Sequence, residues 1–210
     1  MDKNIKKKPR KMINIPNPLA KSFKGKYFVG YSDDLALGEN TSAWAGLFNP
    51  IGSGVYMFVN VWTITELLNT SPIRAQIWFN AKLPGHPTSE SVTVTPANKA
   101  LVPAPKPRVK LLKANNVIGT PTGGVKAFVR RTDPGTTQVF EEDGKYIFAP
   151  GGNLTVFISN PETPEELASA RVAFGWWEEK NINCKEKTGA DKRIRACIRY
   201  IQDWSIWCIN

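Results

Sequence analysis

The stretch "IRAQIWFNAKL", from Ile73 to Leu83, alternates apolar and polar side chains without a break. The apolar set is Ile73, Ala75, Ile77, Phe79 and Ala81, and the other set is Arg74, Gln76, Trp78, Asn80 and Lys82. Successive side chains of a strand point to opposite faces of a sheet, so this alternation predicts a strand that is buried on one face only.

Similar short runs surround this stretch. "VYMFVNVWTI" (55–64) alternates as well, which places Val55, Met57, Val59 and Val61 on one face and Tyr56, Phe58, Asn60 and Trp62 on the other. Further strand-like runs cover residues 92–95, 124–131, 137–142, 145–150, 153–159 and 170–179.

The segments between these runs contain "TDPG", "EDG" and "APGGN", which are typical of tight turns. Only "PETPEELASA" favours a helical turn before residue 185. About eight to ten strands at intervals of about ten residues are the pattern of a sandwich or barrel. The sequence therefore predicts an all-β protein, an antiparallel β-sandwich of jelly-roll-like form.

The charge divides the chain into three parts. Residues 1–26 carry +8, residues 27–179 carry −2 and residues 180–210 carry +4, within a total of +10. We predict a flexible basic arm at 1–24, a β-sandwich domain at 25–179 and a C-terminal extension at 180–210. Only the basic ends could then bind a polyanion by charge.

The arm contains Pro9, Pro16 and Pro18, which interrupt regular structure. Its basic residues suit contact with nucleic-acid phosphates; they are Lys6, Lys7, Lys8, Arg10 and Lys11. No aromatic residue lies between Lys3 and Lys11, so base stacking is not indicated. A solubilising tail and a docking arm for a neighbouring subunit are the alternatives.

No stretch reaches the ~18 apolar residues that span a bilayer, and the N-terminus lacks the apolar core of a secretory signal. We expect synthesis in the cytoplasm without a signal peptide, with a spore or particle surface as the place reached after release.

Several spaced motifs resemble an uncharacterised protein family of spore-forming Gram-positive bacteria. They include "NPIGSG", "VTPAN", "EEDGKYIFAPGG" and "GWWEE", and the resemblance covers roughly residues 25–179. The family has no established activity, so the resemblance supports the domain boundaries, and it implies that the arm and the tail are additions. The strand pattern also looks like the sandwich subunits of phage, capsid and spore-surface structures.

Residues suited to catalysis are few. His86, the single histidine, lies between prolines with no ligand-spaced cysteine or acid nearby, which favours an exposed loop residue over a base or metal ligand. Ser53 lies in "GSG" without the frame of a nucleophile turn. Asp33, Asp34 and Glu39 offer oxygen donors for calcium but no defined spacing. We predict no catalytic residue, no metal, no cofactor and no enzymatic activity.

Several tryptophans are predicted to contact a partner. Trp78 belongs to the polar set of its strand, and adjacent residues Trp176 and Trp177 must face opposite sides, so at most one belongs to the core. Trp204 and Trp207 lie in the tail. We therefore predict partner contacts for Trp78, Trp177, Trp204 and Trp207.

All three cysteines lie at the C-terminal end, at Cys184, Cys197 and Cys208. Residues 193–200 alternate basic and apolar side chains as in a strand, although a helical stripe is also compatible with the sequence. A turn at 202–203 would place Cys197 opposite Cys208 and leave Cys184 for an intermolecular bond or a free thiol.

These features predict a self-assembling structural subunit of a bacterial spore or cell surface, or of a phage-like particle, with terminal segments docked on neighbouring copies. The alternatives are a capsid-like shell protein that binds nucleic acid through the arm, and a sandwich that binds carbohydrate or another ligand through exposed tryptophans.

Overall fold

The computed structural model describes residues 14–67, 72–89 and 93–180, and within these it contains one short helix and eleven strands. The elements are α1 (Asn17–Phe23), β1 (Tyr27–Leu37), β2 (Ser42–Phe48), β3 (Val55–Glu66), β4 (Ile73–Phe79), β5 (Thr88–Ser89), β6 (Thr95–Pro96), β7 (Lys110–Val117), β8 (Val125–Thr132), β9 (Thr137–Phe148), β10 (Asn153–Ser159) and β11 (Ala168–Lys180). Residues 1–180 form one compact unit. The unit formed by residues 1–180 contains all of these elements.

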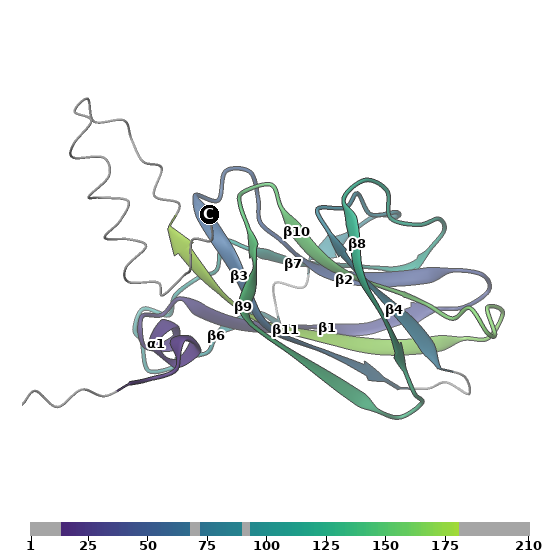
Figure 1. Ribbon diagram of the computed structural model, residues 1–210, viewed down its shortest axis with the longest axis horizontal. Helices are drawn as coiled ribbons and strands as arrows, with labels where there is room; N and C mark the ends of the chain where they lie inside the picture. Colours follow the sequence, from purple (N-terminus) through teal and green to yellow (C-terminus); the bar gives the residue numbers. More distant parts are fainter. Residues whose placement is uncertain (1–13, 68–71, 90–92, 181–210) are drawn as a thin grey trace, which may run out of the picture. The chain divides into compact units, whose positions relative to one another are not determined.

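The strands form two antiparallel sheets that pack as layers, with β1 and β11 in one and β2, β7 and β10 in the other (Figure 1). The five-stranded sheet has the order β6-β1-β11-β3-β9, and the six-stranded sheet has the order β5-β7-β2-β10-β4-β8. From β9 onward each strand lies in the opposite sheet to the strand before it, and β1 to β4 alternate in the same way. The predicted all-β sandwich is confirmed.

The core between the sheets follows from the alternation in β4. Ile73, Ala75 and Ile77 are fully buried, while Arg74 is exposed and Gln76 half-buried. The neighbouring β10 is buried over nearly its whole length, because β4 and β2 flank it and side chains cover both of its faces.

An extra residue in β3 changes which side chains enter this core. Val59 lies opposite Trp176 and Val61 opposite Gly175, so Asn60 has no counterpart in β11. A bulge of this kind reverses the facing of the residues that follow it. Trp62 is consequently buried in the core, and the predicted grouping of Val61 with the core residues is wrong.

A second irregularity lies in β9, for which two strands and a solvated turn were predicted. Glu141 pairs with Val61 and Tyr146 with Val59, so residues 142–145 stand where β3 has only Asn60. The strand continues through this stretch, and "EEDG" is therefore a wide bulge within one strand rather than a hairpin turn.

The expectation of an irregular arm up to residue 24 is wrong for its last part, where α1 forms. Pro18 stands in the first turn of α1, where a missing N–H costs nothing. Lys21 Nζ lies 2.6 Å from Glu179 Oε1, and Lys26 Nζ lies 2.5 Å from Glu179 Oε2. Glu179 of β11 therefore ties both the helix and the start of β1 to the five-stranded sheet.

Candidate functional site

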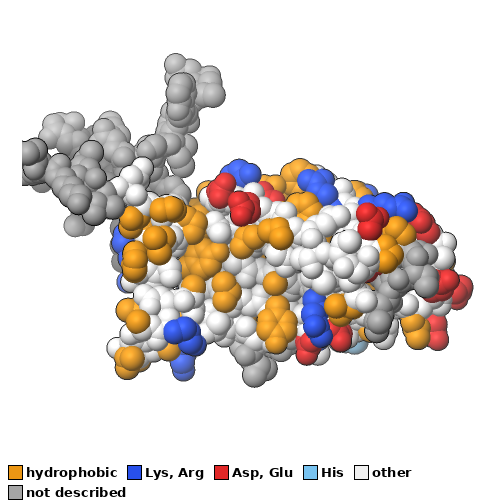
Figure 2. All heavy atoms as spheres, turned by 90° about the horizontal axis from the view of Figure 1, so that it is seen from below, with side chains coloured by type: hydrophobic (Ala, Val, Ile, Leu, Met, Phe, Trp, Pro, Cys, Tyr) orange, Lys and Arg blue, Asp and Glu red, His pale blue; other side chains and the backbone are white. Residues whose placement is uncertain are grey.

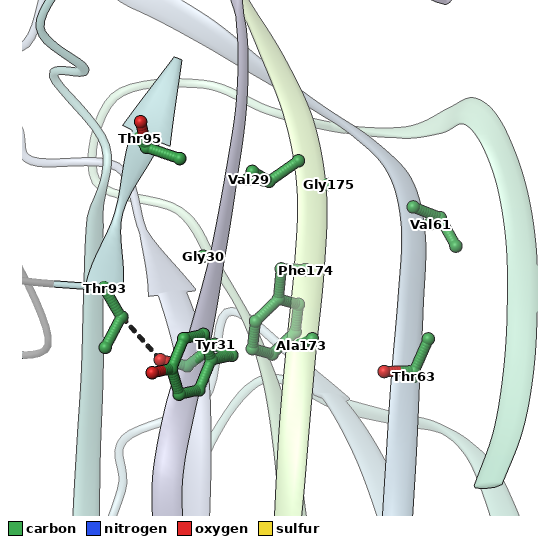
Figure 3. A pocket seen from close by; sticks show the side chains of 10 residues that line it. All are labelled: Val29, Gly30, Tyr31, Val61, Thr63, Thr93, Thr95, Ala173, Phe174 and Gly175. Carbon is green, nitrogen blue, oxygen red and sulfur yellow. Dashed lines mark hydrogen bonds between the residues drawn. The ribbon is translucent and has the colours of Figure 1, made fainter. Parts of the chain in front are cut away.

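The outer face of the five-stranded sheet carries an apolar groove. Its floor is formed by Ala173 and Gly175 of β11, and its sides by outward side chains of β1 and β3. Figure 3 shows these residues on three neighbouring strands, with Thr93 and Thr95 beside β1. The hollow has a volume of about 420 Å³ and is open to solvent. We call it the groove, and define it by Val29, Tyr31, Val61, Thr63, Ala173 and Gly175.

Small residues on the central strand produce the depth of the groove. A Cβ added at Gly175 would stand 2.4 Å from the Tyr27 hydroxyl oxygen and 2.8 Å from Val61 Cγ1. The Tyr27 hydroxyl accepts a hydrogen bond of 2.9 Å from Asn60 Nδ2. Burial raises the pKa of Tyr27, an effect that the bond from Asn60 opposes, so the phenol stays neutral at physiological pH.

Apolar side chains also surround the groove. Tyr31 is 46% exposed and Val29 36%, while Val139 and Ile147 of β9 are exposed to a similar or greater extent. Figure 2 shows orange side chains distributed over this face, with most charged side chains toward its borders. Exposed apolar side chains that share one face with an open groove are typical of an interaction surface.

The border of the groove is acidic on balance. The exposed acids of β1 and β9 are Asp33, Asp34, Glu141 and Asp143. Arg171 Nε lies 2.7 Å from Asp34 Oδ1 and its Nη2 lies 3.7 Å from Asp33 Oδ1. The pair of aspartates that offered donors for calcium is therefore bound to an arginine, and Lys113 Nζ lies 3.3 Å from the backbone oxygen of Asp33. On the β9 side, Glu141 and Asp143 outnumber the single exposed base, Lys145.

Trp177 is not a surface residue, which corrects the prediction that it contacts a partner. Both Trp176 and Trp177 have no exposed area, although they face opposite sides of β11. Trp176 lies in the core between the sheets. On the outer face, Phe58 stacks on Trp177 at a centroid distance of 5.4 Å, Tyr27 lies beside it, and the bulge of β9 covers it.

Trp78 is half-buried on the outer face of the six-stranded sheet. It packs against a second apolar cluster that contains Trp44 and Phe157. Its indole N–H donates to Gln76 Oε1 at 3.2 Å, and Lys126 Nζ lies 5.8 Å from the ring centre. Trp78 lies on the face of its strand that the alternation predicted, away from the core between the sheets. Its contact with a partner stays a prediction.

The remaining predicted residues fall into two groups. The first group lies outside the described residues and consists of Lys6, Lys7, Lys8, Arg10, Lys11, Cys184, Cys197, Trp204, Trp207 and Cys208. His86 is exposed, and Ser53 is buried in a turn where its hydroxyl accepts from the Val55 N–H at 3.3 Å. Within residues 14–67, 72–89 and 93–180, no group of three or more metal-ligating side chains could hold an ion.

The groove itself was not predicted from the sequence. Its signal is the small pair Ala173 and Gly175 at alternate positions in "ARVAFGWWEE", a stretch in which a strand would otherwise carry large side chains. The length of β1 was also missed, because the strand-like sequence "KGKYFVGY" covers only residues 24–31, whereas β1 continues to Leu37.

No helix in the described part of the chain has the length and apolar character needed to cross a membrane.

A family model described as a family of unknown function, DUF6143, matches residues 1–184. The match begins at residue 1 rather than near 25, so the basic arm lies within the family's region and the expectation that it is an addition is wrong. No curated protein and no solved structure matches the chain. With 184 of its 210 residues matched, the chain belongs to the DUF6143 family.

Proposed function

We propose that the protein is a structural subunit that assembles with copies of itself, through the groove of one copy and the C-terminal segment of the next. The observation that carries this proposal is the apolar outer face of the five-stranded sheet, with its open groove and acidic border. The product would be a layer or fibre at a bacterial spore or cell surface, or a phage-like particle.

The order of the strands supports a jelly-roll assignment for the sandwich. The order β1-β11-β3-β9 faces β2-β10-β4-β8, so the first and last strands are neighbours and the chain wraps in two Greek keys. Strand β7 extends the second sheet beside β2. Jelly rolls form the subunits of many shells and lectins, which favours assembly or binding by analogy of fold alone.

The sequence of the tail is complementary to the groove. Residues 193–200 alternate between a set with three arginines and a set with Ile194, Ala196, Ile198 and Tyr200. An extended segment of this kind presents one apolar side to the groove and one basic side to the acids at its border. Residues 181–210 carry six basic and three acidic side chains, so the charges of the tail and the border attract.

The odd number of cysteines supports docking between copies rather than within one. If two cysteines pair in the tail, the third is available for a bond to a neighbour. Oxidation after release from the cytoplasm would then make the assembly permanent.

A paired set of variants tests the proposal by sedimentation velocity under reducing conditions. Val29→Lys with Tyr31→Lys replaces exposed apolar contacts of the groove by charges that repel the basic tail, and we expect self-association to weaken at least tenfold, or ~1.4 kcal/mol or more. Val125→Lys with Val129→Lys makes the same change on exposed positions of β8 and should leave association unchanged. A natural chain that stays monomeric at high concentration would contradict the proposal.

A nucleic-acid-associated shell protein is the second candidate, because the strands of the six-stranded sheet carry only basic charges. They are Arg74, Lys110, Lys113, Lys126, Arg130 and Arg131. Affinity for single-stranded DNA that falls steeply with salt would favour this candidate.

A further inference from the structure

One end of the sandwich combines exposed apolar side chains with basic charge. This end is formed by α1 and by the loop of residues 97–109, which leads from β6 to β7. Leu19 is 44% exposed, Phe23 61% and Val102 92%, and Ile15 is exposed before the helix. Figure 2 shows hydrophobic side chains gathered toward the end at which α1 lies in Figure 1. We call Leu19, Phe23 and Val102 the apolar tip.

Packing holds the helix and the loop together. A Cβ added at Gly25, directly after α1, would stand 2.7 Å from Leu101 Cδ1 and 2.8 Å from Pro105 Cγ. The loop therefore lies against the junction of α1 and β1, and Val102 belongs to the same end of the molecule as the helix.

Two carboxylates of β11 fix this arrangement to the sheet. Glu178 accepts hydrogen bonds from the N–H groups of Arg108 and Val109 at 3.0 and 2.9 Å, and Glu179 binds Lys21. Lys21 is thus buried on the inner side of α1. Leu19 and Phe23, four residues apart, share the helix face that points to solvent.

The charge around the apolar tip is of one sign. Residues 14–26 and 93–110 contain seven basic residues and no acid. Five of them are exposed, namely Lys24, Lys99, Lys106, Arg108 and Lys110. Both nearby acids, Glu178 and Glu179, are buried. In sequence, residues 1–11 add six basic residues and one acid immediately before α1.

We propose that this end of the protein binds the surface of anionic lipid bilayers, with the apolar tip inserted among the acyl chains and the basic residues on the lipid headgroups. Apolar side chains that project from a basic surface are the composition of interfacial membrane anchors. Each basic residue near an anionic surface adds attraction, and this attraction adds to the gain from burial of the apolar tip.

The same charges argue against two other occupants. The C-terminal segment is itself basic, so a neighbour's tail would be repelled here although it is attracted to the groove. A nucleic acid would use the lysines and could stack a base on Phe23, but the aliphatic side chains of Leu19 and Val102 have no ring on which a base stacks.

Co-sedimentation of the full chain with phospholipid vesicles tests this inference. Vesicles of phosphatidylcholine alone are compared with vesicles that contain about one third phosphatidylglycerol, at low and at physiological salt. We expect binding to the anionic vesicles at least tenfold stronger than to neutral ones, and weaker at the higher salt.

Two pairs of variants separate the apolar and the charge contributions. Leu19→Ser with Phe23→Ser should weaken binding to anionic vesicles at least tenfold, whereas Ile118→Ser with Val129→Ser, exposed positions on the loop after β7 and on β8, should leave it within twofold. Lys106→Gln with Lys110→Gln should reduce the preference for anionic vesicles several-fold, and Lys126→Gln with Arg131→Gln should not.

Three results would overturn the inference. They are equal binding to neutral and anionic vesicles, an unchanged affinity of the Leu19→Ser, Phe23→Ser protein, and retention of single-stranded DNA, but not vesicles, by the natural chain. Self-association measured without lipid is independent of this outcome, because the groove lies on a face of the sheet and the apolar tip at its end.

Discussion

Replacing Gly144 by alanine is expected to destabilise the protein by about 2–5 kcal/mol. Gly144 has φ of +75°, a conformation that alanine adopts at a cost of ~1–2 kcal/mol. A Cβ at this position would also stand 2.0 Å from Trp177 Cη2 and 2.4 Å from its Cζ2. Because Trp177 is packed between Phe58 and Tyr27, the ring can move only by displacing them.

Gly135→Ala is the matched control for this change. Gly135 has φ of +69°, and its Cβ would meet no atom within 4 Å. It therefore measures the cost of the backbone conformation without the clash, about 1–2 kcal/mol. Urea denaturation of both variants gives the two free energies of unfolding. If Gly144→Ala and Gly135→Ala lower the free energy of unfolding equally, the bulge of β9 does not cover Trp177.

Glu179→Gln is expected to cost about 2–4 kcal/mol and to release α1 from the sheet. The carboxylate of Glu179 binds two ammonium groups, and the side chains of Glu179 and Lys21 are only 10% and 11% exposed. The amide cannot neutralise Lys21, which is then left as a buried charge or moves into solvent with the helix. Unfolding free energy, together with amide exchange in residues 17–24, measures both effects.

The same change predicts a specific pH dependence. Burial alone would raise the pKa of Glu179, but the hydrogen bonds and charges of Lys21 and Lys26 outweigh it and hold the pKa below the ordinary 4.5. A depressed pKa in the folded state means that the ion pairs stabilise the fold fully above the unfolded-state value. This stabilisation is lost as pH falls through the lowered pKa.

The natural chain should have the larger free energy of unfolding near neutral pH. Its difference from Glu179→Gln should therefore shrink as the pH falls below about 4.5. Glu141→Gln removes an exposed carboxylate of β9, and its unfolding free energy should stay close to that of the natural chain at every pH. If the difference in unfolding free energy between the natural chain and Glu179→Gln does not change with pH, the proposed role of the ion pairs is contradicted.

The alternation of apolar and polar residues predicted the core side chains correctly in regular strands. It failed in strands that contain a bulge. The pattern in β4 assigned Ile73, Ala75 and Ile77 to the core correctly, since nothing interrupts that strand. In β3 the extra residue Asn60 reversed the faces, and a bulge leaves no mark in the pattern of apolar residues.

The candidate site depended on contacts between strands that are distant in sequence. Trp176 and Trp177 do face opposite sides of β11, as predicted, but burial of Trp177 also needs residue 144 of a different strand. The groove likewise combines β1, β3 and β11, whose pairing no single stretch of sequence reveals. For α1, Pro16 and Pro18, two of the prolines that argued against a helix, stand at its start, where they are tolerated.

Photo-crosslinking from the groove tests assembly through the tail most directly. Tyr31, which is exposed beside the floor of the groove, is replaced by p-benzoylphenylalanine in the full chain, and equal amounts of nitrogen-14 and nitrogen-15 protein are mixed before irradiation. The account predicts that mass spectrometry finds mixed-isotope products in which position 31 of one copy is joined to residues 193–210 of another. Products that join position 31 only to the tail of its own copy, or to no tail at all, would contradict it.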